Sequence, residues 1–472
     1  MSKMLRALVA TVALAVSVGT SASAAEAQPP ESLAVIASSL GQKALTDPAA
    51  FDFVQSLTTE IGPRLAGTAA HQRAVAWAEA KLKAAGFQDV HSEPFSFPAW
   101  IRGVENADVV GPVPQHLAVT ALGGSVATDV SGLEAEIVLF RTYDELLAAA
   151  PGSLKGKIAV VTQHMVRAPD GSGYGAANRI RRLGPSEAAK RGAVAYLLRS
   201  LGTDSHRLPH TGALNYRDDT PRIPAAALAI PDADQLERLA ALGPVRIRLV
   251  LTPTVQENAL SWNVVGEIKG RGRADEIVLI GGHLDSWDLG TGATDDGAGT
   301  AIAFGAARLI AGLPQRPSRT IRVVLFGAEE MDFSGAAYAR AHEAETGKIM
   351  VAAEADFGAR NVFSVQLPPG GAGSDFGRTL QRIIAPLPQH PGSAVIKVAR
   401  AVIPIRRDKV EALRHPNLHH YTQHFLFTTL RRLVAKFPQR VARLQKDSRF
   451  NIGHLQDPAN SFPRGRQLVR FF

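Results

Sequence analysis

One short stretch of the sequence concentrates side chains that can bind metal ions. Residues 281–300 read GGHLDSWDLGTGATDDGAGT and contain one His, four Asp and six Gly between two apolar runs. Two adjacent Glu and another Asp follow two later apolar runs. The polar residues concerned are His283, Asp285, Asp295, Asp296, Glu329, Glu330 and Asp356. Imidazole and carboxylate ligands without thiolates suit Zn2+ or a similar divalent ion. Because adjacent Glu point differently, one can bind metal while the other acts as a general base toward a bound water.

Two other interpretations of residues 281–300 have to be weighed. Asp and Gly are common in turns at strand ends, so any single residue could be purely structural. A phosphate-binding loop is the second alternative, but the stretch lacks the Lys-Ser/Thr pair and carries acids where phosphate would lie. Neither a His-Glu-x-x-His helix nor a Gly-x-Ser-x-Gly elbow occurs in the chain. Ligand-type residues after three successive apolar runs therefore favour a metal site.

The elements that must position these residues are predicted strands and helices in alternation. The apolar, β-branched runs at 275–283, 319–330 and 348–358 are predicted strands that run into the polar residues. Helices are predicted over 30–45, 47–62, 68–87, 298–313 and 334–345. This order predicts an α/β fold with a mixed central sheet and helices on both faces. In such folds the site lies at the carboxyl ends of the strands.

A segment of different character interrupts this series. Residues 126–255 contain short strands, many turns and one helical piece, which predicts a small β-rich insert. The main domain would then consist of residues 25–125 and 256–388. His206 and His210 in the insert are interpreted as loop residues, and Trp287 either packs beside the site or contacts a substrate.

The N-terminus and the composition point to export from the cytoplasm. Lys3 and Arg6 precede an apolar run that ends in Ala22-Ser23-Ala24, which is typical of a signal peptide spanning residues 1–24. The run is short for a membrane anchor, and no other stretch is long and apolar enough to span a bilayer. The chain has no Cys, which excludes disulfides and thiolate ligands. We therefore expect a periplasmic or secreted protein.

The character of the chain changes again near residue 388. Residues 389–472 contain 16 Lys and Arg against 4 Asp and Glu, whereas the whole chain has 52 and 43. One interpretation is an authentic basic tail with a helix at 425–437 that docks on a membrane surface or an acidic partner. The other is a shift of the reading frame near Pro388. The basic charge does not indicate nucleic-acid binding, because the rest of the chain is slightly acidic and contains no recognisable reading module.

Several ordered motifs resemble one known family. GGHLDSWDLGTGATDDGAG, LFGAEEMDFSGA and EADFG are similar to motifs of the co-catalytic zinc aminopeptidase and glutamate carboxypeptidase family. Residues 62–87 resemble a segment near the start of that peptidase domain, and the insert resembles its protease-associated domain. The resemblance covers about residues 47–387.

The resemblance implies roles for individual residues. His283 and Asp356 would bind one zinc ion, Asp295 would bridge two ions, and Glu330 would bind the second. Glu329 would be the general base, and Asp285 would orient the imidazole. The family's further ligand, a His in the late part of the chain, has only His420 as a candidate, and no acid follows it at the expected place.

These observations predict a secreted exopeptidase with two Zn2+ ions that hydrolyses dipeptides or the terminal residues of peptides. A peptidase-like binding protein without catalysis, disabled by its tail, remains an alternative. A metal-dependent amidase on the same scaffold is another. Peptides or dipeptides are the expected partners, without nucleic acid or a membrane span in the mature chain, and the resemblance allows a homodimer.

Overall fold

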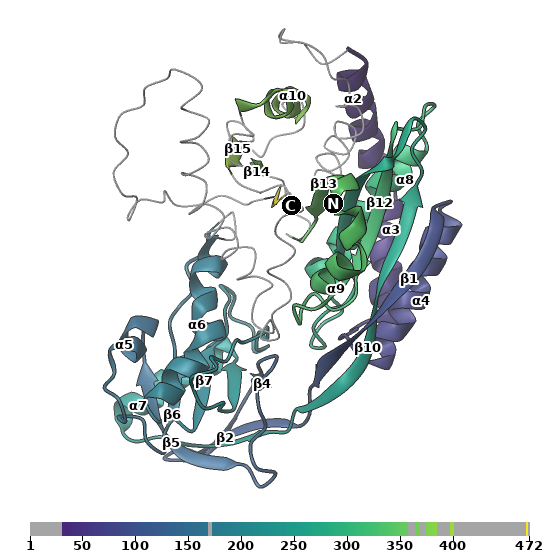
Figure 1. The fold of residues 1–472 in the computed structure, drawn as a ribbon. Helices are drawn as coiled ribbons and strands as arrows, with labels where there is room; N and C mark the ends of the chain where they lie inside the picture. Colours follow the sequence, from purple (N-terminus) through teal and green to yellow (C-terminus); the bar gives the residue numbers. More distant parts are fainter. Residues whose placement is uncertain are drawn as a thin grey trace, which may run out of the picture.

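The protein contains two large sheets that lie at opposite ends of the molecule (Figure 1). The structure is a computed structural model, and it describes residues 31–168, 172–356, 358, 364–367, 373–384, 397–400 and 469–470. The predicted signal peptide and His420 lie outside these residues. So does the basic helix predicted in the tail.

The first sheet belongs to the main domain and has five strands in the order β1-β10-β12-β11-β13. Strand β11 pairs in parallel with both β12 and β13, whereas β10 is antiparallel to β12 and to β1. The strands are β1 (Gln88–Ile101), β10 (Thr254–Ile268), β11 (Arg273–His283), β12 (Arg319–Phe326) and β13 (Ile349–Glu354). The sheet is thus mixed, as the sequence predicts.

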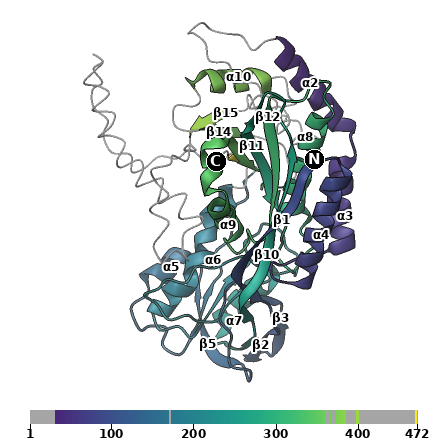
Figure 2. The ribbon, with the colours of Figure 1, turned by 45° about the vertical axis from the view of Figure 1, so that its right-hand side comes forward.

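Helices cover one face of this sheet (Figure 2). Alternate residues of each strand point to that face, and their apolar side chains pack against the helices. Val264, Ile280 and Val323 pack there against helices α2 (Glu31–Thr46), α3 (Ala49–Ser56), α4 (Ala69–Ala84) and α8 (Ala298–Ala311). Thr68 caps the N-terminus of helix α4, and its hydroxyl accepts a hydrogen bond from the His71 amide at 3.2 Å.

The opposite face carries a smaller apolar cluster. Its residues are the sequence neighbours of Val264, Ile280 and Val323 and point to the other face of the sheet. They are Val265, Leu279 and Val324, which pack against Tyr338 of helix α9 (Ser334–Ala341). Helices therefore lie on both faces of the sheet, which confirms the predicted fold class.

The second sheet forms the insert, which we define as residues 105–251. Its eight strands follow the order β3-β2-β9-β5-β6-β7-β8-β4. The strands are β2 (Glu105–Gly111), β3 (Gln115–Leu117), β4 (Val119–Ala121), β5 (Leu133–Phe140), β6 (Ile158–Val161), β7 (Ala195–Arg199), β8 (Ala225–Leu228) and β9 (Arg246–Leu251). Because β2, β3 and β4 belong to this sheet, it begins at Glu105, ahead of the boundary at residue 126 expected from the sequence.

Helices pack on both faces of the insert's sheet. Helix α7 (Ile230–Leu242) contributes to one apolar cluster, and helices α5 (Tyr143–Ala148) and α6 (Ser172–Lys190) contribute to the other. Two short linkers, 102–104 and 252–253, join the insert to β1 and β10. The insert is therefore attached at one end of the long β1-β10 pair, as Figure 1 shows.

Arg102, in the first linker, fixes the insert against the main domain. Its Nε donates to both carboxylate oxygens of Asp288, at 2.9 and 2.7 Å, and its Nη1 donates to Glu105 Oε1 at 2.5 Å. Trp287 lies beside this contact, with its ring centroid 6.3 Å from that of Trp100. The Trp287 ring is partly buried and lies against the apolar cluster of the insert.

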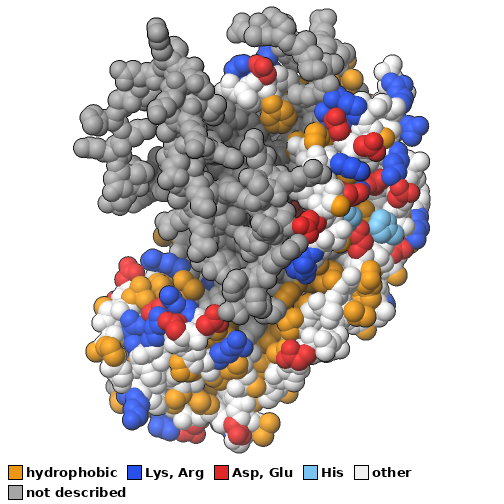
Figure 3. Space-filling view, in the orientation of Figure 1, with side chains coloured by type: hydrophobic (Ala, Val, Ile, Leu, Met, Phe, Trp, Pro, Cys, Tyr) orange, Lys and Arg blue, Asp and Glu red, His pale blue; other side chains and the backbone are white. Residues whose placement is uncertain are grey.

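The remaining described elements are short. They are η1 (Leu57–Ile61), η2 (Ala293–Gly297), η3 (Glu343–Lys348), β14 (Ser364–Leu367), α10 (Asp375–Ile384), β15 (Lys397–Arg400) and β16 (Val469–Arg470). Within the described residues, no helix combines the length and the apolar character needed to cross a bilayer. On the face seen in Figure 3, basic and acidic side chains are interspersed over the described surface.

Candidate metal centre

The sheet register brings the candidate ligands together at one edge. His283, the last residue of β11, lies opposite Phe326, the last residue of β12, so the chain that follows Phe326 carries Glu329 and Glu330 past the imidazole. On the other side of β11, Gly281 pairs with Glu354, the last residue of β13, and Asp356 follows two residues later. Parallel pairing therefore explains why His283 and Asp356, 73 positions apart in the sequence, lie close together.

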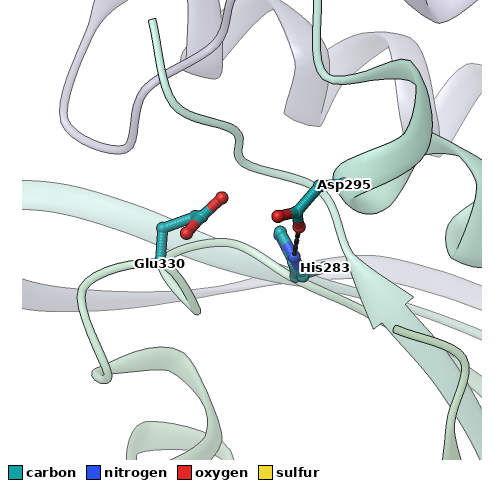
Figure 4. Close-up of side chains that lie close together, drawn as sticks. All are labelled: His283, Asp295 and Glu330. Atoms are coloured by element: carbon teal, nitrogen blue, oxygen red, sulfur yellow. Dashed lines mark hydrogen bonds and ion pairs between the residues drawn. The ribbon is translucent and has the colours of Figure 1, made fainter. Parts of the chain in front are cut away.

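His283 is the centre of this cluster. Its side chain is 1 % exposed, and its Nε2 lies 2.9 Å from Asp295 Oδ1 and 3.8 Å from both Glu329 Oε2 and Asp356 Oδ1. Two overlapping sets of ligand atoms result, each within 4.8 Å: His283 with Asp295 and Glu330, and His283 with Glu329 and Asp356. Figure 4 shows the Asp295 carboxylate directly over the imidazole and the Glu330 carboxylate to one side of both. All five predicted residues of the metal and base set therefore lie together.

Asp285 holds two parts of the cluster in place. Its backbone carbonyl lies 3.0 Å from His283 Nδ1 and its Oδ1 lies 3.5 Å from the same nitrogen. Its carboxylate also accepts hydrogen bonds from the amides of Glu329, at 3.0 Å, and Glu330, at 3.3 Å. The buried carboxylate thus fixes the loop after β12 as well as the imidazole, which is more than the sequence predicts for it.

Asp296 plays a structural part. It is fully buried, and its carboxylate accepts hydrogen bonds from the His283 amide at 2.9 Å and the Gly299 amide at 3.0 Å. It therefore ties the end of β11 to the first turn of α8. Glycine is required at position 299, because a Cβ there would lie 1.5 Å from the Ala355 carbonyl oxygen.

Arg64 is a positioning residue that has no role in the sequence prediction. It lies in the connection between η1 and α4 and is fully buried. Its Nε donates to the Leu284 carbonyl at 2.5 Å, and Nη1 and Nη2 donate to the carbonyls of Thr291 and Gly292 at 2.6 and 2.9 Å. The guanidinium therefore closes the loop between His283 and Asp295. The only signal in the sequence is its position in the GPRLAG segment.

The electrostatics of the cluster fit a bound cation. Burial raises the pKa of Glu329 and of Glu330 well above the usual value, and neighbouring carboxylates raise both further. Burial also raises the pKa of Glu354 to about 7, an effect that Asp356 and Asp285 strengthen. Glu330 Oε1 and Glu354 Oε1 are buried and lack a hydrogen-bond partner in the described structure. Crowded carboxylates with unused oxygens are stabilised when a cation lies between them.

Comparison with known proteins identifies the family. Residues 263–415 match the model of peptidase family M28. The chain is 36% identical over 335 residues to Carboxypeptidase Q of Mus musculus, an alignment that covers 71% of this chain and 69% of that protein. The chain belongs to peptidase family M28. The resemblance of the motifs to this family, and within it to plasma glutamate carboxypeptidase (carboxypeptidase Q), is thereby confirmed.

Other M28 relatives agree in sequence and fold. Carboxypeptidase Q of Bos taurus is 38% identical over 304 residues, and the alignment covers 64% of this chain and 63% of the relative. The chain thus spans less than two thirds of the length of that protein. A crystal structure of a peptidase M28 precursor from Shewanella amazonensis SB2B has a TM-score of 0.73 and 44% identity, covering 79% of this chain and 84% of that one. The M28 match also extends beyond residue 388, where the composition changes.

Proposed function

We propose that this M28 protein is a zinc-dependent exopeptidase that hydrolyses dipeptides or terminal residues of peptides. The observation that carries the proposal is the pair of ligand sets that share His283 at the ends of three neighbouring strands. The two sets share one imidazole and together offer four carboxylates, of which Glu329 is kept for proton transfer. Imidazole and carboxylate ligands are the ligand chemistry of a catalytic zinc site. We assign His283, Asp295, Glu330 and Asp356 to two Zn2+ ions.

Each residue of the site has a separate role in hydrolysis. Bound Zn2+ supplies polarisation of the scissile carbonyl and a water molecule of lowered pKa. Glu329 accepts a proton from the attacking water and delivers it to the leaving amine. Asp285 keeps Glu329 in place through the amide hydrogen bond at 3.0 Å. The Asp295 side chain is 67% exposed whereas His283 is 1% exposed, so substrates approach from the Asp295 side.

The proposal includes the place where the enzyme acts. The residues 1–24 carry the pattern of a signal peptide, and the chain has no Cys. We therefore place the mature enzyme in the periplasm or outside the cell, where it acts on peptides, and allow for a homodimer.

Hydrolysis of unmodified dipeptides by the purified protein tests this function. We expect cleavage after incubation with Zn2+, loss of cleavage on chelation, and recovery when Zn2+ is added back. Cleavage that persists in a metal-free preparation would refute the zinc mechanism. Zinc binding without any cleavage would instead favour the peptidase-like binding protein, and cleavage of amides but not peptides would favour the amidase.

A further inference from the structure

Both loops that supply the metal ligands contact the insert or its linker. The first loop, residues 284–292, joins β11 to η2 and so lies between His283 and Asp295. The second loop, residues 327–333, joins β12 to α9 and carries Glu330. Each loop makes its contact through two consecutive residues, an apolar residue followed by an aspartate. The two pairs are Trp287-Asp288 in the first loop and Met331-Asp332 in the second.

Trp287 and Asp288 form the contact of the first loop. The indole lies against the apolar cluster of the insert, and a Cβ at Gly123 of the insert would lie 1.9 Å from Trp287 Cη2. The absence of a side chain at position 123 therefore leaves the space that the ring occupies. Asp288 accepts hydrogen bonds from Arg102, whose Nη1 in turn donates to Glu105 of strand β2. The first loop is thus attached to the insert by packing and through an ion pair.

Met331 and Asp332 form the contact of the second loop. Met331 packs against the same apolar cluster as Trp287. Asp332 accepts a hydrogen bond from Arg182 Nη2 of α6 at 3.1 Å, and its own amide donates to the Glu329 carbonyl at 2.7 Å. Its φ is +64°, a left-handed conformation in which Asp and Asn are more common than other residues with a side chain. The turn that carries the proposed general base is therefore attached to α6.

The arginines of these two contacts are well shielded from solvent. The side chains of Arg102 and Arg182 are 10% and 14% exposed. By comparison, Arg179 of α6 pairs with Asp144 within the insert, and these side chains are 54% and 78% exposed. An exposed pair of that kind contributes little to stability, whereas shielded pairs are screened less by salt and water. The two loop contacts are therefore suited to hold the loops in place.

The position of the loops matters for metal binding. One ligand set combines His283 and Asp295, which flank the first loop, with Glu330 of the second, so the separation of the loops decides how its atoms fit an ion. Converging carboxylates repel one another before the ion arrives. Ligands that are already held near their bound positions bind more tightly, because less ordering is needed on binding.

We propose that the insert positions both loops and thereby sets the affinity of the centre for zinc. This inference rests on the proposed zinc function of the site and gives the insert a role in it. The residues that carry this role are positioning residues, because they act through the loops.

Zinc affinity, measured in a metal-buffered titration, tests the proposal. Arg182→Met and Asp332→Asn each break the second contact, and Asn is compatible with the left-handed conformation at position 332. Trp287→Ala breaks the first contact, and Gly123→Ala breaks it from the insert by displacing the indole. Each variant should bind zinc about tenfold more weakly than wild type. The Arg182→Met/Asp332→Asn double variant should bind no more weakly than the weaker single variant, because both changes remove the same contact.

Two controls separate positioning from general damage to the insert. Arg179→Met removes an ion pair that lies within the insert and should not change zinc affinity. Leu146→Ala makes a cavity in the other apolar cluster of the insert, to which neither Trp287 nor Met331 belongs, and should lower the urea midpoint at unchanged zinc affinity. Loop-contact variants that lose stability but bind zinc as wild type does would overturn the proposal. So would a Leu146→Ala variant that binds zinc as weakly as they do.

Hydrogen exchange of the metal-free protein separates this proposal from the proposed function. The amides of residues 284–292 should exchange faster in Gly123→Ala than in wild type, and those of residues 327–333 should exchange faster in Arg182→Met. This expectation holds whether or not the protein cleaves peptides. Wild-type exchange rates in both loops of the variants would overturn the positioning role. A wild-type protein that binds zinc but cleaves no peptide would refute only the exopeptidase function, because the zinc affinities of the variants still decide the role of the insert.

Discussion

Replacing Arg64 with Met should destabilise the protein by loosening the loop between His283 and Asp295. Met fills the space of the aliphatic stem but leaves the carbonyls of Leu284, Thr291 and Gly292 without their donor. Leu284 is fully buried, so solvent does not replace its lost donor, whereas Thr291 is exposed and Gly292 is partly exposed.

The magnitude follows from the three hydrogen bonds. A hydrogen bond from a charged donor contributes about 1.5–3 kcal/mol, so three would contribute roughly 4.5–9 kcal/mol. Burial of the guanidinium offsets part of this, as shown by the pKa of Arg64, which burial lowers to about 10 although Asp285 and Asp296 act to raise it. We therefore expect a net loss of about 3–5 kcal/mol, the range found when one partner of a buried charged contact is removed.

Urea unfolding, followed by tryptophan fluorescence, measures this loss as a lower midpoint at an unchanged slope. Arg64→Lys keeps the charge but cannot make the same three contacts, so its free energy of unfolding should lie between that of Arg64→Met and that of wild type. Arg73→Met, an exposed change on α4, is the control and should stay within about 0.5 kcal/mol of wild type. An Arg64→Met variant within about 1 kcal/mol of wild type would refute the reasoning.

Three further changes probe the site. Asp285→Asn places an amide group against two N–H donors, so zinc should bind about 10- to 100-fold more weakly in a metal-buffered titration; unchanged affinity would contradict its positioning role. Glu329→Gln should keep its zinc while kcat falls by about 10²–10⁴, and a fall below tenfold would exclude it as the general base. Gly299→Ala should cost about 1–3 kcal/mol in unfolding experiments through its clash with Ala355, whereas Gly335→Ala, in open space on α9, should not destabilise the protein.

The sequence predicts the strands of the main sheet that lead into the candidate metal centre, because their local hydrophobic pattern matches their burial in the fold. The apolar runs before His283, Glu329 and Asp356 are long and β-branched, so they are recognisable as buried strands, and their parallel order brings their ends together. The signal peptide and the assignment of ligands to individual ions remain predictions.

The start of the insert could not be predicted in the same way. Strands β3 and β4 have three residues each, and Pro112 and Pro114 interrupt the apolar pattern between β2 and β3. Such short segments become strands only because neighbouring strands pair with them, as β8 does with β4. Their membership of the sheet is a tertiary property.

Long-range contacts also explain why Arg64 has no role in the sequence prediction. Arg64 donates hydrogen bonds to carbonyls that lie more than 200 residues away in the sequence. Every residue has a backbone carbonyl, so the residue type does not reveal which carbonyls accept these bonds. The chemistry of a metal ligand is visible in its residue type, whereas that of a positioning residue depends on what it contacts.

The zinc content of the protein and of its His283→Gln variant after exhaustive dialysis is the measurement that tests the central claim most directly. His283 is the imidazole ligand proposed for one of the two ions, so its loss should release that ion. We predict that wild type retains close to two zinc ions per chain and that the variant, folded by circular dichroism, retains no more than one. A variant that holds as much zinc as wild type, or a wild-type protein that holds none, would contradict the metal centre described above.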